Sequence, residues 1–322
     1  MASDETRGPI ALIGLDWGTS RLRAYLFDAA GTVIAAKAHP WGVLAMPDSD
    51  FGAAYAAITG PWEKVAPGVA VIAAGMIGST EGWVRAPYVP CPAGPRELGA
   101  ALVETKVGNG RLFVIPGVDQ HAPQSDVMRG EETQIAGALA LRPELAAGAT
   151  LILPGTHAKW AAVHDGRIVS FTTYMTGELF ALLRDHSILG RPARKAAAQG
   201  ETNRVVAWEA FDRGVATARD SGTRGIAPVL FGTRSLVLHE ELRARDSLDY
   251  LSGLLIGDEL RSALSGIPQQ PALIGEEALC DRYARALQSF GASVTIVPDS
   301  SAAGLWSVAC AAGLAAPAAT HV

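Results

Sequence analysis

The chain has 322 residues, of which 49% are hydrophobic and 18% charged, and its 27 basic and 32 acidic residues give a formal net charge of -5. This composition predicts packed cores for two domains of ordinary size and excludes wholesale disorder, and the lack of a Lys/Arg stripe argues against nucleic acid as the main partner. Three widely spaced cysteines form no disulfide framework or metal pattern, and the apolar stretch at residues 10–15 is too short for a signal sequence or a membrane span, so we expect a cytoplasmic protein.

Strands and turns dominate the first fifty residues. "IALIGLDWG" predicts a buried strand, "RLRAYLFD" a half-buried strand, and "AAGT" a hairpin turn that leads to a third strand, "VIAAKA". A helix follows at residues 51–66 and is stopped by Pro67 and Gly68. "VAVIAAGMIGS" then predicts a buried strand with a glycine-rich turn, "RELGAALVETK" a helix, "RLFVIPGV" a strand, and residues 126–141 a helix.

The second half returns to strands and then becomes helical. "ATLILPGTHAKWAAVHDGRIVSFTTY" predicts three strands joined by two turns, and "GELFALLRDHSIL" and "NRVVAWEAFDRGVATARD" predict helices. Two more helices are expected at residues 234–264, and "PALIGEEALCDRYARALQSFG" and "SVTIVPDSSAAGLWSVACAAGL" each predict a strand, a turn and a helix. Alternating strands and helices predict an α/β fold, although the hairpins at the start of each half argue against an all-parallel sheet.

An internal repeat relates the two halves. Gly18-Thr19 and Asp28 recur as Gly155-Thr156 and Asp165, each time within a buried strand, a turn, an alternating strand and a hairpin. The repeat predicts two related domains that face each other across a cleft. Asp16 corresponds to Leu153 in the second copy, so only the first turn carries a carboxylate, as expected if one side organises a cation.

The first turn is a candidate phosphate loop. Backbone amides of Gly18, Thr19 and Ser20 could surround an anion, and Asp16 could hold Mg²⁺ through water. A plain hairpin in which Asp16 caps the turn is the alternative. For Trp17, stacking on a ligand and packing under the turn both remain open.

The second turn could close on the distal phosphates of a nucleotide. Lys159 would supply a point charge there, although a solvated strand residue is an equal alternative for Lys159 and a plain turn residue for His157. A helix start downstream, at Thr176, fits either ordinary capping or an N-terminus aimed at phosphate. The candidate phosphate-binding residues of this half are Gly155, Thr156, His157, Lys159, Thr176, Gly177 and Glu178.

"QSDVMRGEETQIAGALAL" places small and polar residues on one helical face, and glycines within a helix suggest close approach by another backbone or a ligand. Asp126 is either the N-cap of that helix or a general base that accepts a hydroxyl proton. Arg129 and Glu131 would clamp an acidic substrate, or would form an exposed helix pair.

A glycine-rich loop and a strand–turn–helix complete the candidates. "AAGMIGSTEGWVRAPYVPCPAG" is long enough to suggest a substrate loop, with Gly75, Gly78 and Ser79 beside the substrate and Arg85 as a second cation for its carboxylate. "LIGEEALCDRYARAL", with Gly275 and Glu276, could hold an adenosine, although its spacing alone favours an ordinary βα unit.

Several motifs together resemble the 2-dehydro-3-deoxygalactonokinase family of the actin-like ATPase superfamily. The resemblance runs from residue 12 to about residue 314 and rests on "DWGTSRLRAYL", "AAGMIGSTEGW", "APYVPCPAG", "DVMRGEETQIAGAL", "LPGTHAKW", "FTTYMTGELFALLRDHSIL" and "YLSGLLIGDEL". It implies an α/β fold of two ribonuclease-H-like domains flanking a cleft. The N-terminal domain, residues 8–145, would carry the first phosphate loop and the sugar-acid side. The C-terminal domain, residues 146–322, would carry the second phosphate loop and the adenosine side.

The resemblance implies transfer of the γ-phosphoryl group of ATP to the 6-hydroxyl of 2-dehydro-3-deoxy-D-galactonate, with Mg²⁺ as cofactor and Asp126 as the general base. Glu276 and Glu277 follow a single glycine, Gly275, which departs from the usual multi-glycine adenosine motif and puts the mode of base binding in doubt. The expected partners are the sugar acid and ATP, without nucleic acid or membrane, and a homodimer is the candidate assembly. A kinase for another sugar, a phosphate-releasing hydrolase and a non-catalytic sugar-responsive regulator are the alternatives.

Overall fold

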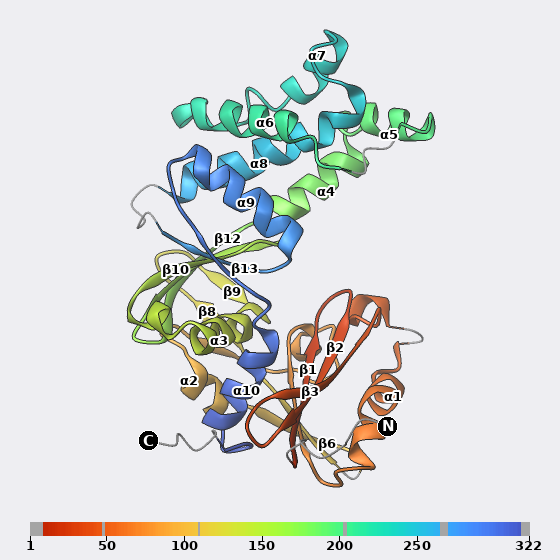
Figure 1. Ribbon diagram of the computed structural model, residues 1–322, viewed down its shortest axis with the longest axis vertical. Helices are drawn as coiled ribbons and strands as arrows, with labels where there is room; N and C mark the ends of the chain where they lie inside the picture. The colour runs from red at the N-terminus through yellow and green to blue at the C-terminus, as the bar shows by residue number, and fades with distance from the viewer. Residues whose placement is uncertain (1–8, 47–48, 109, 202–204, 265–269, 317–322) are drawn as a thin grey trace, which may run out of the picture. The chain divides into compact units, whose positions relative to one another are not determined.

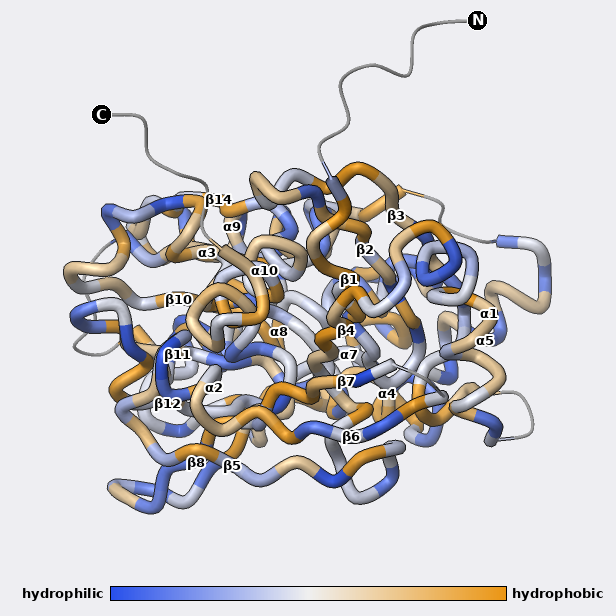
Figure 2. The backbone as a smooth tube through the Cα atoms, turned by 90° about the horizontal axis from the view of Figure 1, so that it is seen from below, coloured by the Kyte–Doolittle hydropathy of each residue, from blue (hydrophilic) through white to orange (hydrophobic). Residues whose placement is uncertain are grey.

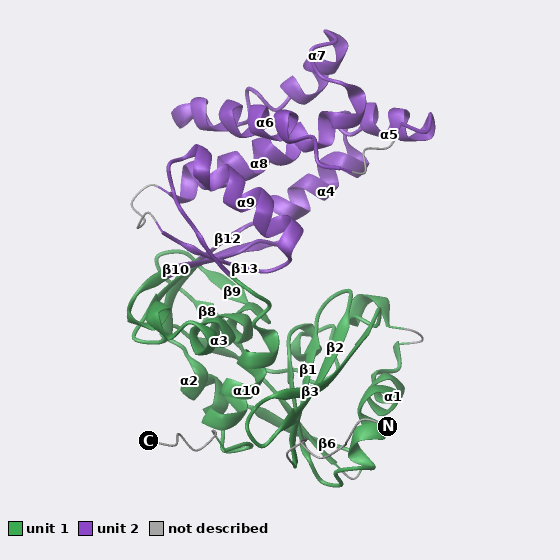
Figure 3. Ribbon diagram, viewed as in Figure 1, with its two compact units in different colours: residues 1–149, 161–171, 297–322 green, residues 150–160, 172–296 purple. Residues whose placement is uncertain are grey.

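The computed structural model describes residues 9–46, 49–108, 110–201, 205–264 and 270–316 (Figure 1). The chain groups into two compact units (Figure 3). Unit 1 comprises residues 1–149, 161–171 and 297–322, and unit 2 comprises residues 150–160 and 172–296. The domain boundary between residues 145 and 146 stays a prediction. The polar N-terminal segment at residues 1–8, the C-terminal residues 317–322, and residues 203–204 of a predicted helix lie outside the described residues.

A six-stranded sheet with the order β3-β2-β1-β4-β7-β6 forms the centre of unit 1. Strands β1 to β3 make an antiparallel meander, and β1 pairs in parallel with β4, which pairs in parallel with β7. In Figure 2 the hydrophobic colours concentrate on central strands such as β1 and β4, whereas polar residues mark the edge strand β6. The strands are β1 (Ile10–Trp17), β2 (Leu22–Asp28), β3 (Val33–His39), β4 (Ala70–Ala74), β6 (Val103–Val107) and β7 (Gly110–Val114).

The second large sheet has the order β12-β11-β10-β13-β14, so it repeats the first: a meander, then a parallel neighbour on the other side of the first strand. The predicted repeat and the fold class, two ribonuclease-H-like sheets, are confirmed. Its strands are β10 (Ala149–Leu153), β11 (Ala158–His164), β12 (Arg167–Tyr174), β13 (Ala272–Ile274) and β14 (Thr295–Val297).

A small third sheet joins β5 (Tyr88–Pro90), β8 (Gly117–Gln120) and β9 (Asp126–Met128) in unit 1. Strand β8 is central, parallel to β5 and antiparallel to β9. This sheet was not predicted, because its strands are three or four residues long and show no clear alternation.

The structure contains most of the predicted helices, and one further helix at Arg191–Ala198 that was not predicted. The helices are α1 (Phe51–Glu63), α2 (Pro95–Ala100), α3 (Glu131–Leu141), α4 (Thr176–His186), α5 (Arg191–Ala198), α6 (Trp208–Asp220), α7 (Gly232–Leu238), α8 (Ser247–Ala263), α9 (Glu277–Ser289) and α10 (Ser301–Ala311). Within the described ranges, no helix is both long and apolar enough to cross a membrane.

The helix predicted for "RELGAALVETK" is wrong in its second half. Helix α2 ends at Ala100, and "VETKV" is strand β6, which pairs antiparallel with β7. Alternate β6 residues are half-buried and exposed, as in an edge strand, and the charged residues of "VETKV" occupy the exposed positions.

Glycines let helices pack at backbone contact in both units. In unit 1, a Cβ on Gly137 of α3 would lie 1.9 Å from a carbonyl oxygen preceding α10, and one on Gly304 of α10 would lie 1.8 Å from the Thr133 carbonyl oxygen. In unit 2, a Cβ on Gly214 of α6 would lie 2.2 Å from the Tyr250 carbonyl oxygen, and one on Gly253 of α8 would lie 2.0 Å from the Phe211 carbonyl oxygen. The close backbone approach predicted from the glycine at position 137 is therefore confirmed, and the neighbour is another helix.

Candidate active site

The first candidate phosphate loop is the turn between β1 and β2. The carbonyl groups of Gly18 and Thr19 accept hydrogen bonds from the amides of Val43 and Leu44, at 3.0 and 3.1 Å. The side chains of Thr19 and Ser20 are exposed. The turn is thus held from one side and faces solvent on the other, as a loop that receives a ligand requires.

Trp17 belongs to the core beneath this turn. It is 0% exposed, its ring lies 5.7 Å from that of Phe51 and 6.4 Å from that of Trp83, and its indole nitrogen donates to the Trp41 carbonyl at 2.7 Å. Packing therefore explains this residue, and stacking on a ligand does not.

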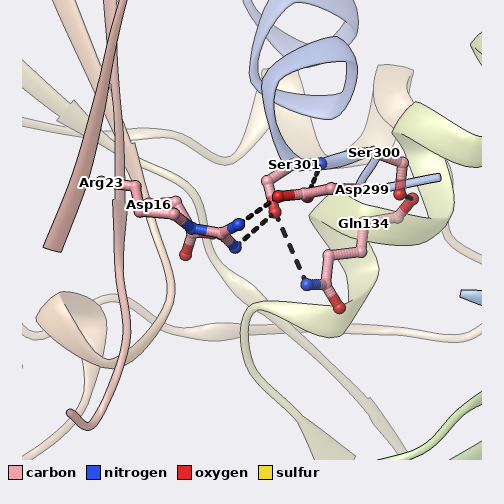
Figure 4. Close-up of polar contacts among 6 residues, drawn as sticks. All are labelled: Asp16, Arg23, Gln134, Asp299, Ser300 and Ser301. Atoms are coloured by element: carbon pink, nitrogen blue, oxygen red, sulfur yellow. Dashed lines mark hydrogen bonds and ion pairs between the residues drawn. The ribbon is translucent and has the colours of Figure 1, made fainter. Parts of the chain in front are cut away.

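Asp16 and Asp299 share one cation, Arg23 (Figure 4). Arg23 Nη2 donates to Asp16 at 2.5 Å, and Arg23 Nη1 donates to Asp299. The same Nη2 lies 3.2 Å from Ser301 Oγ, to which Gln134 donates at 3.5 Å. The end of β1 is therefore linked to the first turn of α10 and to α3, and the Asp16 carboxylate has a charged partner within unit 1.

Three loops of unit 1 meet around two glycines. A Cβ on Gly75, which has a φ of +93°, would lie 2.8 Å from the Trp17 carbonyl oxygen, and one on Gly130, with a φ of +107°, would lie 3.4 Å from the Gly75 Cα. Glycine adopts such φ angles without the steric cost that other residues incur. The loops after β1, β4 and β9 are thereby brought into contact, and Gly75, predicted on a substrate loop, adjoins the first candidate phosphate loop.

Arg129 crosses the loop that follows β4. Its Nη2 donates to the carbonyls of Ala86 and Pro87 at 2.9 and 3.3 Å, and its guanidinium carbon lies 4.4 Å from the centre of the Tyr88 ring. A Cβ on Gly78 would lie 2.8 Å from Arg129 Nη1, so glycine leaves room for this side chain. Arg129 Nε and Nη1 are buried, and no described residue accepts a hydrogen bond from them. A guanidinium group held in place with two donors still available can bind both oxygens of a carboxylate.

The other two residues predicted on this loop are the sequence neighbours of residues that contact Arg129: Ser79 follows Gly78, and Arg85 precedes Ala86. Ser79 is half-buried and its amide donates to the Met76 carbonyl, whereas Arg85 is exposed. Their roles in substrate binding stay predictions.

The helix predicted from Asp126 begins instead at Glu131. Asp126 lies on β9, opposite Gln120, and the positive φ of Gly130 separates that strand from α3. Asp126 is therefore not an N-cap, and Arg129 and Glu131 are not an exposed helix pair. Glu131 accepts a hydrogen bond from the Arg129 amide at 3.0 Å and so stabilises the turn between β9 and α3.

Glu132, in the first turn of α3, is a buried carboxyl that the sequence analysis did not identify. It is 1% exposed and accepts hydrogen bonds from the Gly130 amide at 2.6 Å and the Thr133 hydroxyl at 2.9 Å. Burial, with a smaller contribution from the charge of Glu131, raises the pKa of Glu132 to about 7. A group that changes charge near neutral pH thus lies beside the glycine that contacts Gly75.

The Glu132→Gln variant is expected to lose part of the pH dependence of stability. The pKa of Glu132 rises from 4.5 to about 7 on folding, so between these values the folded chain holds a proton that the unfolded chain has released. Stability therefore falls as the pH rises through this window, by about 3 kcal/mol from this group. Denaturant titrations from about pH 4.5 to about pH 8 should show that fall in the wild type and not in the variant. Equal pH slopes would contradict this origin.

Unit 2 contains a cavity of about 430 Å³. Its walls come from the loop after β10, the first turn of α4, and helices α8 and α9. One wall is apolar, made by Phe180, Leu255, Ile256 and Leu279. Five of the predicted nucleotide-binding residues line the cavity: Gly155, Thr156, Thr176, Gly177 and Glu276. An apolar wall beside a few polar groups is typical of small-molecule sites.

The second candidate phosphate loop is fastened to the N-terminus of α4. The Glu178 amide donates to the Thr156 carbonyl at 3.0 Å, and a Cβ on Gly177 would lie 2.4 Å from the Gly155 carbonyl oxygen. His157 Nε2 lies 2.5 Å from the Glu178 carboxylate, so these two predicted residues pair with each other. A helix N-terminus beside a glycine loop favours phosphate oxygens, because unpaired amides and the positive end of the helix dipole meet there.

Lys159 and Gly275 are not among the residues that line this cavity. Lys159 is 5% exposed on β11, and its ammonium group donates to Thr173 Oγ1 at 2.8 Å, so the alternative of a solvated strand residue is wrong. Gly275, with a φ of +153°, forms the turn before α9, and Glu276 is the N-cap residue of that helix. The contact of Lys159 with distal phosphates stays a prediction.

The cavity also contains residues that the sequence analysis missed. Arg282 is one of them, and it donates to Asp249 at 2.7 Å. The available signal was helical spacing, since the lining residues recur three and four positions apart on α8 (Ser252, Leu255, Ile256) and on α9 (Leu279, Arg282, Tyr283).

A second missed residue is Glu259 on α8, which is 3% exposed. Trp160 donates to its Oε1 at 2.7 Å, and Tyr283 donates to its Oε2 at 2.7 Å. Thr176, at the start of α4, also donates to Oε2. Burial raises the pKa of Glu259, and the three donated hydrogen bonds oppose that rise.

The chain is similar to known proteins along most of its length. The sequence model of a family described as 2-keto-3-deoxy-galactonokinase matches residues 16–308. The chain is 36% identical over 303 residues to the 2-dehydro-3-deoxygalactonokinase of Escherichia coli strain K12, covering 92% of this chain and 97% of that one. A crystal structure of a candidate 2-dehydro-3-deoxygalactonokinase from Sinorhizobium meliloti superimposes with a TM-score of 0.81 at 32% identity, covering 93% of this chain and 98% of the other.

Proposed function

The chain belongs to the 2-keto-3-deoxy-galactonokinase family, and we propose that unit 2 binds ATP while unit 1 binds the sugar acid. The protein is a sugar-acid kinase, which transfers the γ-phosphoryl group of ATP to the 6-hydroxyl of 2-dehydro-3-deoxy-D-galactonate. The family match along most of the chain carries this conclusion. The cavity and loops described above support it, because they offer groups suited to phosphates and to a carboxylate.

The unit 2 cavity is the proposed nucleotide site. Its apolar wall on α4, α8 and α9 would receive the adenine ring, which is flat and poorly solvated. Gly155, Thr156 and the first turn of α4 would hold the phosphates through backbone amides. Glu276, which lines the same cavity, would accept hydrogen bonds from the nucleoside.

The proposed sugar-acid site is the junction of the β4 loop with the β9–α3 turn. Arg129 supports this assignment, because two of its donors are buried without a partner in the described chain while a third fixes the side chain to Ala86. Its guanidinium would pair with the substrate carboxylate. Gly75, Gly78 and Ser79 would form the adjoining wall, with Arg85 and Glu131 as further candidates.

Asp126 is the proposed proton acceptor. It lies on β9, three residues before Arg129, and is half-buried. A carboxylate at this place could orient the 6-hydroxyl and take its proton as the phosphoryl group arrives.

The residues at the first phosphate loop fit Mg²⁺. In the described part of the chain no group of three or more His, Cys, Asp and Glu side chains could hold a metal ion alone. Kinases need no such group, since Mg²⁺ takes one or two carboxylates together with phosphate oxygens and water. Asp16 and Asp299 already share one cation, so Asp16 could hold Mg²⁺ through water with Asp299 beside it. Bound Mg²⁺ would neutralise charge that develops on the transferring phosphoryl group.

A coupled ADP-release assay over a panel of sugar acids tests the function. ADP should form from ATP when 2-dehydro-3-deoxy-D-galactonate is present, and glucose and glycerol should give no release. Equal release with and without an acceptor would favour a phosphate-releasing hydrolase, and release with a different sugar acid alone would assign another substrate.

A further inference from the structure

Glu259 is a buried carboxyl that contacts two residues of the unit 2 cavity without lining the cavity itself. Tyr283 and Thr176 both line the cavity, and both donate to Glu259 Oε2. Burying a carboxyl group away from solvent costs free energy unless hydrogen bonds offset that cost. Three side chains, from β11, α4 and α9, donate hydrogen bonds to Glu259. We therefore expect Glu259 to help set the geometry of the cavity.

The hydrogen-bond directions around Glu259 fix the orientation of the Thr176 hydroxyl. The indole nitrogen of Trp160 can only donate, and it occupies Oε1. Thr176 Oγ1 donates to Glu259 Oε2, as Tyr283 does, so the Thr176 hydroxyl hydrogen is directed at the carboxyl group. Tyr283 also lies within hydrogen-bonding reach of Thr176, so one lone pair of Thr176 Oγ1 remains for a ligand. A hydroxyl fixed in this way accepts a hydrogen bond and does not donate one to a phosphate oxygen.

The neighbours of Thr176 indicate which part of the ligand lies there. Gly177 is in backbone contact with Gly155 and Thr156, and all three line the cavity, so Thr176 stands at the proposed phosphate end. Phosphate oxygens cannot donate hydrogen bonds, whereas the waters that Mg²⁺ retains can. We propose that Glu259 is a positioning residue that fixes the Thr176 hydroxyl as an acceptor for the water shell of the nucleotide's Mg²⁺. This inference rests on the proposed nucleotide site in unit 2.

Calorimetric titration of the whole chain with a non-hydrolysable ATP analogue, once with Mg²⁺ and once with EDTA, tests the inference. Glu259→Gln and Thr176→Val should each weaken binding of the Mg²⁺-bound analogue about ten-fold. Binding of the metal-free analogue should stay within about two-fold of the wild type. The double variant should bind the Mg²⁺-bound analogue no more weakly than the single variants, because both remove the same oriented hydroxyl.

Asp258→Asn is the matched control, because it removes a carboxylate from the neighbouring position of α8 that pairs with Arg261 and does not line the cavity. It should keep the wild-type affinity for both forms of the analogue. Thr176→Val keeps the shape of a half-buried side chain outside the core, so it tests the inference even if Glu259→Gln folds poorly. Equal weakening with and without Mg²⁺, additive effects in the double variant, or unchanged binding in Thr176→Val would overturn the inference. Failure of the wild-type chain to bind the analogue in either buffer would instead overturn the proposed function.

Discussion

Replacing Asp126 with asparagine is expected to lower kcat by about 10²–10⁴-fold, the range typical of a positioned general base. The amide keeps the size of the side chain and can still accept the hydrogen bond that Asp126 Oδ1 takes from the Val127 amide at 2.8 Å. The β8–β9 hairpin should therefore persist, and the KM for ATP should change little. Steady-state kinetics with thermal unfolding of the same preparation would measure both effects.

Asp119→Asn is the matched control for this variant, because Asp119 lies on the neighbouring strand β8, opposite Val127. It should keep most of the wild-type kcat. Near-normal turnover in folded Asp126→Asn would contradict the assignment. It would also direct attention to Glu132, the buried carboxyl whose pKa of about 7 suits a proton acceptor at neutral pH.

Replacing Arg129 with methionine is expected to raise the KM for the sugar acid on the order of 10²-fold and to leave the KM for ATP nearly unchanged. The cost follows from leaving the substrate carboxylate without its charged partner in a buried site. The sharper measurement compares the sugar acid with its primary amide. The wild type should prefer the acid strongly, and the variant should treat both alike, because the group that distinguishes them is gone.

Arg85→Met is the control for charge loss on the same loop. Arg85 is exposed, so its removal should change the KM for the sugar acid by only a small factor. If Arg85→Met abolished the preference for the acid and Arg129→Met kept it, the carboxylate would belong to Arg85 instead.

The fold was largely predictable because it is built from long, periodic strands and an internal repeat. The alternation in "RLRAYLFD" and the recurrence of Gly18-Thr19 as Gly155-Thr156 define two meanders, and each extends to a parallel neighbour in the structure. Residues 126–130 were mispredicted because the strand β9 has only three residues, and the conformation of Gly130 depends on contact with Gly75. Such contacts between distant residues leave no local pattern.

The candidate-site residues in loops and at helix starts could be predicted from the sequence, whereas those inside helices could not. Gly155, Thr156 and Thr176 stand at turns and helix starts, whose chemistry can be read locally. Arg282 and Glu259 lie inside long helices, where a charged side chain usually faces solvent. Their roles emerged only when the packing of α8 and α9 placed one at the cavity and buried the other.

The most direct test of the assigned reaction is phosphorus and carbon NMR of the product formed from ATP and 2-dehydro-3-deoxy-D-galactonate. We predict one phosphorylated product in which phosphorus couples to the C6 carbon, formed in equal amount with ADP. Release of inorganic phosphate in place of that product, or coupling to a different carbon, would contradict the account.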